Sequence, residues 1–141
     1  RHVGLTESVA MIADAMGWKL ETITDVIGPK IATKTTSSQF LTVKKGQVAG
    51  IVQTGTGYDK DGQARITLHM EAYLGAPKSY DATIVKGVPD LTMRIDGGVH
   101  GDIATAAITV NSIPKVLTAP AGLQTMRSMV IPSYFGGKSK R

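Results

Sequence analysis

Two long strand-forming runs separated by a short turn sequence constrain the fold of this chain more than any other feature. The first run spans residues 47–58 and the second spans residues 63–74, and both contain many of the β-branched residues that favour strands. Residues 59–62, with the sequence DKDG, lie between them and are of the types that form tight turns. The pattern therefore predicts an antiparallel β-hairpin.

An amphipathic helix is predicted near the start of the chain, over residues 6–16. Its apolar positions are spaced three or four residues apart, which places them on one helix face. They are Val9, Ile12, Ala13 and Met16. Thr6 or Ser8 can cap its N-terminus, Glu7 suits the positive end of its dipole, and Gly17 can end it in a left-handed turn.

A second helix is predicted from about residue 102 to residue 117. Its apolar stripe consists of Ile103, Ala107, Val110 and Leu117. Asp102 is of a type that caps helix N-termini well. Pro114 is expected to kink or end this helix, because proline lacks an N–H donor and clashes with the preceding turn.

The segments between these helices predict further strands and one loop. Residues 18–32 indicate an extended segment that bends at Gly28 and Pro29. Residues 33–39, TKTTSSQ, are polar and predict a loop, whereas residues 80–85 and 91–95 predict two shorter strands. Trp18 and the methionines are expected in the core.

The grouping of strands between two helices predicts an α+β fold. We expect a mixed or mostly antiparallel sheet with the two main helices packed on one face. The other face of such a sheet meets either water or a partner. Thr54, Thr56, Thr67 and His69 are expected on that face, which makes it a wet surface or a moderately polar subunit interface.

Length and charge limit the domain organisation and the partners. A chain of 141 residues has room for one domain, which we place at residues 1–137. Residues 138–141 carry three of the net +5 charges and are expected to form a disordered basic tail. The rest of the chain has 13 basic and 11 acidic residues, a net charge of +2. Only 5% of the residues are aromatic, so we expect no nucleic-acid partner, the alternative being a nucleic-acid-binding arm formed by the tail.

Three further features concern the cellular setting. The chain has no cysteine, which favours an intracellular, cytoplasmic protein. No run of 18 apolar residues is present, so no membrane partner is expected. The first residue is Arg1 rather than Met, and we therefore expect the chain to begin within a longer polypeptide or a processed one.

One glycine-rich segment is a candidate site. Residues 96–102, DGGVHGD, lie between a predicted strand end and a predicted helix start. Their glycines let backbone amides approach a ligand closely, and His100 can change charge near neutral pH. The alternative is a purely structural connection. Gly55 and Gly57 do not form a dinucleotide site, because the third glycine is missing and a strand rather than a helix follows.

Two segments resemble a known family. They are RHVGLTESVAMIADAMGWKL and, more specifically, IDGGVHGDIATAAITVNSIPKVLTAPAGLQTM. They are similar to the C-terminal domain of the 2,4-diaminopentanoate dehydrogenases and their dihydrodipicolinate-reductase-like relatives, and the resemblance runs from Val3 to about Phe135. It implies a substrate-binding and oligomerisation domain of an NAD(P)-dependent amine dehydrogenase, whose partners are an amino-acid-like substrate and further copies that associate through the sheet.

The resemblance also implies what the chain lacks and where substrate binds. NAD or NADP would be bound by a Rossmann domain that is not part of these residues, and the reaction would be oxidative deamination of an amino or diamino acid. His100 and Asp102 form one candidate substrate-binding cluster, and Thr6, Glu7 and Ser8 form the other. The open alternative is a non-catalytic ligand-binding or assembly module of the same fold.

Glu7 is the most informative departure from the related reductases. These reductases carry a Lys-x-Asp-Ala-Pro-Ser-Gly-Thr segment before a helix that holds a substrate carboxylate. When the two helices are aligned, Glu7 replaces the glycine and Val3 replaces the aspartate, with Arg1 at the position of the lysine. A glutamate there would repel a carboxylate, by on the order of 4 kcal/mol at 4 Å and moderate dielectric, and would attract an ammonium group. The alternative is a charge at the helix start that faces water.

Overall fold

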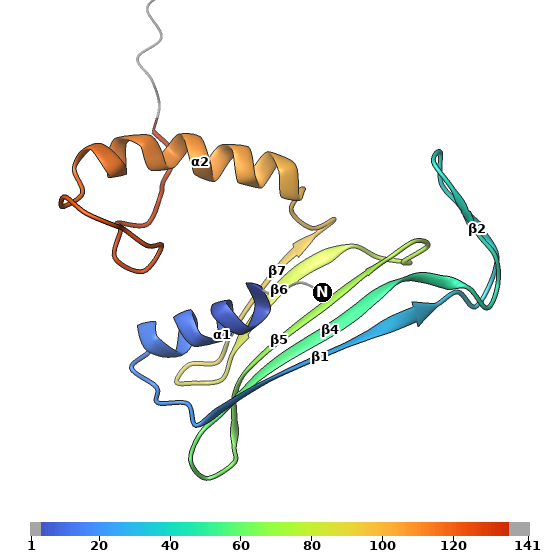
Figure 1. The fold of residues 1–141 in the computed structure, drawn as a ribbon, viewed down its shortest axis with the longest axis horizontal. Coiled ribbons are helices and arrows are strands. Elements are labelled where there is room, and N and C mark those ends of the chain that lie inside the picture. Colours follow the sequence, from blue (N-terminus) through green and yellow to red (C-terminus); the bar gives the residue numbers. More distant parts are fainter. Residues whose placement is uncertain (1–3, 136–141) are drawn as a thin grey trace, which may run out of the picture. The chain divides into compact units, whose positions relative to one another are not determined.

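The computed structural model describes residues 4–135 and has an α+β fold (Figure 1). The elements are α1 (Gly4–Ala15), β1 (Thr22–Ile31), β2 (Thr36–Ser37), β3 (Thr42–Val43), β4 (Val48–Tyr58), β5 (Ala64–Tyr73), β6 (Tyr80–Val85), β7 (Leu91–Asp96) and α2 (Gly101–Leu117). Every strand pair is antiparallel, with one three-stranded sheet in the order β1-β4-β5 and two pairs, β2-β3 and β6-β7. The predicted fold class is therefore confirmed.

The chain forms two compact units. Unit 1 spans Arg1–Pro77 and contains α1 and β1 to β5, and unit 2 spans Lys78–Arg141 and contains β6, β7 and α2. The predicted tail at residues 138–141 lies outside the described residues. No helix within residues 4–135 is both long and apolar enough to cross a membrane.

Helix α1 packs on the three-stranded sheet through two glycines of β4. Val9, which is fully buried, and Ala13 form the core with Ile66 of β5. A Cβ atom at Gly55 would lie 3.3 Å from Leu5 Cδ2, and one at Gly57 would lie 2.9 Å from Val9 Cγ1. The two glycines thus let the helix approach the sheet closely, which explains them without a phosphate ligand.

The boundaries of α1 correct part of the prediction. The helix begins at Gly4, so Thr6 and Ser8 lie inside it and neither is its N-cap. At the other end the prediction is confirmed, because Gly17 is left-handed with φ +69° and the Trp18 amide donates to the Ala13 carbonyl over 2.8 Å. Met16 and Trp18 were expected in the core, but they are 53% and 39% exposed, so the prediction is wrong for both.

Strand β1 covers ten residues of the predicted extended segment 18–32 and has no irregularity at the predicted bend. Gly28 and Pro29 lie within continuous pairing to β4, and the register shift falls instead at Lys30 and Ile31. Pro29 is tolerated because β1 is an edge strand, where a missing N–H costs no ladder hydrogen bond. The predicted loop at residues 33–39 contains β2, which pairs with β3 in an arm that projects beyond the sheet (Figure 1).

The β4–β5 hairpin confirms the opening prediction, and Asp59 holds its turn. The Asp59 carboxylate accepts hydrogen bonds from the Asp61 and Gln63 amides over 3.0 and 2.9 Å and lies 2.9 Å from Arg65 Nε. The Gln63 amide is the main cause that lowers the pKa of Asp59, with the Asp61 amide and Arg65 adding to the effect. The charged carboxylate thus stabilises the turn.

Replacing Asp59 by alanine should make the protein less stable at neutral pH but not at low pH. Because the pKa of Asp59 is lower in the folded than in the unfolded state, its contribution is present above an unfolded pKa of about 3.9. It is lost as the pH falls through the folded pKa. Urea denaturation midpoints should therefore differ between wild type and Asp59→Ala at pH 7 and converge as the pH falls through the folded pKa of Asp59. Asp61→Ala, which keeps the turn amide, is the control; an equal loss there would contradict the assignment.

Unit 2 contains the second predicted helix, with two corrections. The helix begins at Gly101, and its N-cap is His100 in extended conformation without a side-chain capping bond, so Asp102 is not the cap but lies in the first turn. Pro114 does not end the helix, which continues to Leu117. Near the C-terminus a proline removes only the one intrahelical bond that its N–H would have made to Val110.

Candidate functional site

The first predicted cluster lies in the first turns of α1. Leu5 and Val9 face the sheet and are buried, whereas Glu7 is exposed and Thr6 and Ser8 are half-buried. Two helical positions separate Glu7 from Val9, a rotation of about 200°, so Glu7 points away from the sheet. Its carboxylate is thus presented on the side of α1 away from the sheet.

The second predicted cluster lies at the start of α2. His100 and Asp102 are both exposed, two residues apart, on either side of the first helical residue. Gly97 and Gly98 have φ values of +86° and +70°, a conformation that glycine adopts without strain. The predicted glycine-rich connection between strand and helix is therefore present.

The amides of this connection are already used within the protein. The Gly97 amide donates to the Ser79 carbonyl over 2.8 Å, and the Gly98 amide donates to the Ile95 carbonyl over 3.2 Å. The Val99 amide donates to Asp81 Oδ2 over 2.7 Å. These three amides serve the connection itself, and any ligand contact here falls to His100, Asp102 and the first turn of α2. Asp81 was not predicted, because it lies 18 residues before Val99.

A row of polar side chains crosses the face of the three-stranded sheet opposite α1, here called the outer face. Thr54 Oγ1 lies 2.9 Å from His69 Nδ1, and His69 Nε2 lies 3.2 Å from Glu71. Lys30 Nζ donates to Glu71 over 3.0 Å and lies 4.8 Å from the centre of the Tyr73 ring. The outer face therefore carries the predicted Thr54 and His69, together with charged residues that were not predicted.

Lys30 and Glu71 form the ion pair of this row. Their hydrogen bond is the main cause that raises the pKa of Lys30 and lowers the pKa of Glu71, and His69 lowers the pKa of Glu71 further. Both groups are thus charged at neutral pH. The alternation of His69, Glu71 and Tyr73 along β5 is the sequence signal that places them on one face.

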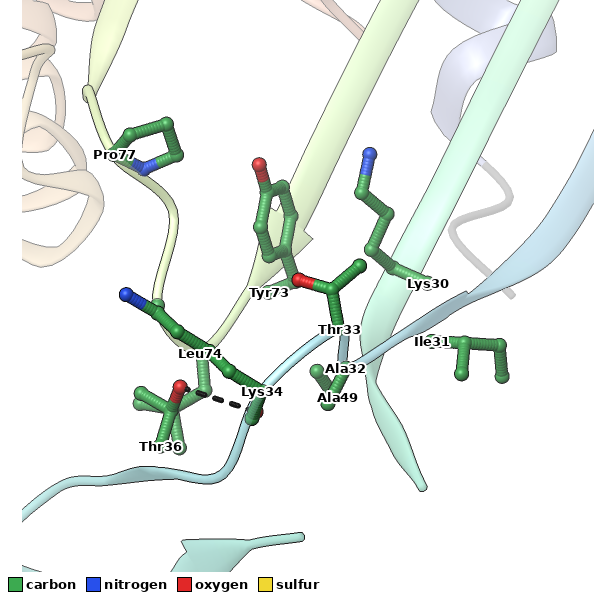
Figure 2. Close-up of a pocket in the computed structure, with 11 residues that line it drawn as sticks. Lys30, Ile31, Ala32, Thr33, Lys34, Thr36, Ala49, Tyr73, Leu74 and Pro77 are labelled. Atoms are coloured by element: carbon green, nitrogen blue, oxygen red, sulfur yellow. Dashed lines mark hydrogen bonds between the residues drawn. The ribbon is translucent and has the colours of Figure 1, made fainter. Parts of the chain in front are cut away.

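A pocket of about 360 Å³ lies in unit 1 where the sheet meets the base of the β2–β3 arm. It is lined by Lys30, Ile31, Ala32, Thr33, Lys34, Thr36, Ala49, Tyr73, Leu74, Gly75 and Pro77. The Lys30 and Tyr73 side chains project in the same direction beside Thr33, and Lys34 extends toward Pro77 (Figure 2). The lining contains two lysines and no acidic residue, and the Lys30 ammonium is paired over 3.0 Å with Glu71, which compensates its charge.

The described residues contain neither a metal-ligand cluster nor, at Gly55 and Gly57, a nucleotide-binding loop. Among residues 4–135, no three His, Cys, Asp or Glu side chains are grouped so that they could hold a metal ion. Gly55 and Gly57 of β4 pack beneath α1 and form no phosphate cradle, so these two glycines do not fit a nicotinamide cofactor.

Comparisons with known proteins agree with this architecture. The sequence model for the 2,4-diaminopentanoate dehydrogenase C-terminal domain matches residues 1–141. The chain is 38% identical to a 2,4-diaminopentanoate dehydrogenase from Acetoanaerobium sticklandii over 96% of its own length and 40% of that protein. It also shares its fold with an amine dehydrogenase from Mycobacterium smegmatis, with a TM-score of 0.71 and 23% identity over 88% of this chain and 37% of that one. The chain thus spans about two fifths of the length of these relatives.

Proposed function

The chain belongs to the family of 2,4-diaminopentanoate dehydrogenase C-terminal domains, and from this we propose that it is the substrate-binding and oligomerisation domain of an NAD(P)-dependent amine dehydrogenase. The observation that carries the proposal is the family match over all 141 residues. The reaction would be oxidative deamination of an amino or diamino acid. NAD or NADP would be bound by another part of a longer polypeptide, since the chain covers 40% of its dehydrogenase relative and Gly55 and Gly57 are occupied by packing against α1.

The role of this domain would be to hold the charges of the substrate. Glu7, exposed on the outer side of α1, is suited to bind an ammonium group, with Thr6 and Ser8 beside it. His100 and Asp102 at the start of α2 would supply a second set of polar contacts. Such contacts contribute to rate mainly by fixing the orientation of the reacting carbon. The enzyme would act in the cytoplasm.

Assembly is the second part of the proposal. The outer face presents Val26, 68% exposed, beside Thr54 and the charged row of β5. A face of mixed polarity on the side of the sheet away from α1 is suited to pairing with the same face of a second copy. We therefore assign homo-oligomer formation to the outer face.

Replacing Glu7 by glutamine in the longer polypeptide should weaken binding of a diamino acid. Loss of the carboxylate charge near an ammonium group should raise the Michaelis constant about tenfold, equivalent to about 1.4 kcal/mol. Initial rates with 2,4-diaminopentanoate and NAD⁺ or NADP⁺ measure this. Glu21→Gln, an exposed glutamate outside the proposed site, is the control.

Three outcomes separate the proposal from its alternative. An unchanged Michaelis constant for Glu7→Gln would remove Glu7 from the site while leaving the enzyme assignment in place. A longer polypeptide that oxidises no amine with either cofactor would contradict the enzyme assignment itself. Binding of an amino acid without turnover would then favour a non-catalytic ligand-binding module of the same fold.

A further inference from the structure

The glycine-rich connection before α2 is tied to the first strand of the β6–β7 hairpin. The Gly97 amide donates to the Ser79 carbonyl over 2.8 Å, and the Val99 amide donates to Asp81 Oδ2 over 2.7 Å. Asp81 pairs with Ile95 in the strand ladder, and its side chain reaches a residue 18 positions later in the sequence. These contacts lie within unit 2 and hold the connection against the hairpin.

The hydrogen bond from Val99 to Asp81 is the one with a carboxylate as acceptor. A charged acceptor makes a hydrogen bond shorter and about twice as strong as one between neutral groups. A Cβ atom at Gly98 would lie 3.0 Å from Ser79 Oγ and 3.4 Å from Asp81 Oδ2, so glycine leaves room for the carboxylate to reach the Val99 amide. A side chain of β6 thus anchors the backbone directly before His100.

His100 is the residue whose placement depends most on this anchor. Its backbone is extended, with φ −67° and ψ 114°, and its side chain makes no capping hydrogen bond. Its carbonyl accepts the Ala104 amide over 2.9 Å. The backbone of His100 is therefore held on one side by Asp81 through Val99 and on the other by the first turn of α2. These two anchors set the direction of its Cα–Cβ bond.

We propose that Asp81 is a positioning residue for substrate binding, which fixes the direction of the His100 side chain through the Val99 amide. The proposal rests on the proposed function, because His100 is there assigned a polar contact to the amino-acid substrate. A neutral imidazole has one donor and one acceptor nitrogen, so a change in its direction removes or exchanges the hydrogen bond that it offers. Asp81 acts through His100 and needs no contact with the substrate.

Asp81→Ala in the longer polypeptide should raise the Michaelis constant for 2,4-diaminopentanoate about tenfold and change kcat by no more than about twofold. A contact that is equally strong in the ground state and the transition state affects only the Michaelis constant. Asp81→Asn keeps an oxygen acceptor without the charge and should raise the Michaelis constant no more than about threefold.

Asp90→Ala is the matched control for the loss of a carboxylate–amide hydrogen bond. Asp90 Oδ1 accepts the Gly87 amide over 2.9 Å in the turn between β6 and β7, at the opposite end of the hairpin from Val99. The substitution removes a bond of the same kind from the same hairpin. It should leave the Michaelis constant unchanged, because it does not move His100.

Two further measurements show whether Asp81 acts through His100. The double variant with Asp81→Ala and His100→Ala should have the Michaelis constant of His100→Ala alone, because the effects of coupled residues do not add. In the 141-residue chain, the Val99 amide should exchange with solvent at least about tenfold faster in Asp81→Ala than in wild type or Asp90→Ala. Circular dichroism reports folding, and Asp81→Asn carries the comparison if Asp81→Ala does not fold.

Three results would overturn the proposal. Equal increases for Asp81→Ala and Asp90→Ala would show that Asp81 only stabilises the hairpin. Additive effects in the double variant, or an unchanged Michaelis constant for His100→Ala in an enzyme that oxidises amines, would separate Asp81 from a role through His100. If the longer polypeptide oxidises no amine, the proposed function fails, and the dissociation constant of 2,4-diaminopentanoate replaces the Michaelis constant. An equal dissociation constant for wild type and Asp81→Ala would then contradict the positioning role as well.

Discussion

Gly50→Ala should lower the free energy of unfolding by about 3 kcal/mol. Gly50 lies in β4 between Lys30 of β1 and Tyr73 of β5. A Cβ atom there would overlap the Ala72 carbonyl oxygen and lie 2.5 Å from Tyr73 Cα. These are backbone atoms of the neighbouring strand, so no side-chain rotation relieves the clash, and β4 and β5 would have to separate at the pocket.

Gly28→Ala is the matched control for this effect. Gly28 lies in β1 of the same sheet, but no atom lies within 4 Å of an added Cβ, and its φ is outside the left-handed region. Alanine there should change stability by no more than about 0.5 kcal/mol. Urea denaturation followed by Trp18 fluorescence and backbone circular dichroism measures both variants. Equal losses at the two glycines would show that β4 and β5 are not paired in this register.

Local patterns predicted those elements whose chemistry is contained in a few neighbouring residues. The β4–β5 hairpin follows from DKDG between two strand-forming runs, and α1 follows from the spacing of Val9 and Ala13. The β2–β3 arm was missed because its pairing depends on Ser37 and Thr42, whose hydroxyl groups meet over 2.8 Å across five residues. Polar strands of two residues have no periodicity from which they could be predicted.

The candidate site was predictable to the same extent. The placement of Glu7 and His100 at helix starts could be predicted because helix starts and glycine-rich connections are visible in sequence, and their part in substrate binding stays a prediction. The Lys30–Glu71 pair was not found, because its partners lie 41 residues apart and meet only through the register of two strand pairs. Asp81 was missed for the same reason. Its carboxylate accepts a hydrogen bond from the Val99 amide, and most of the β6–β7 hairpin lies between the two residues in the sequence.

Val26→Asp should separate the proposed homo-oligomer into single protomers. Val26 is 68% exposed in β1 and pairs with Thr54, which in turn pairs with His69 of the charged row. When two outer faces meet around a two-fold axis, each protomer contributes one aspartate side chain in place of Val26. The variant interface therefore contains two carboxylates. A carboxylate without a partner in a buried interface costs several kcal/mol, enough to reduce the association constant at least about 100-fold.

Sedimentation velocity of the longer polypeptide and of the 141-residue chain measures this dissociation. Met11→Asp is the control, because Met11 is an apolar residue of α1 with 42% exposure and does not belong to the outer face. Wild type and Met11→Asp should sediment as the same oligomer, and Val26→Asp should sediment as a protomer. Dissociation by Met11→Asp alone would place the subunit contact on α1. In that case the row from Thr54 to Lys30 would be a solvated surface, and its ion pair would stabilise only the protomer.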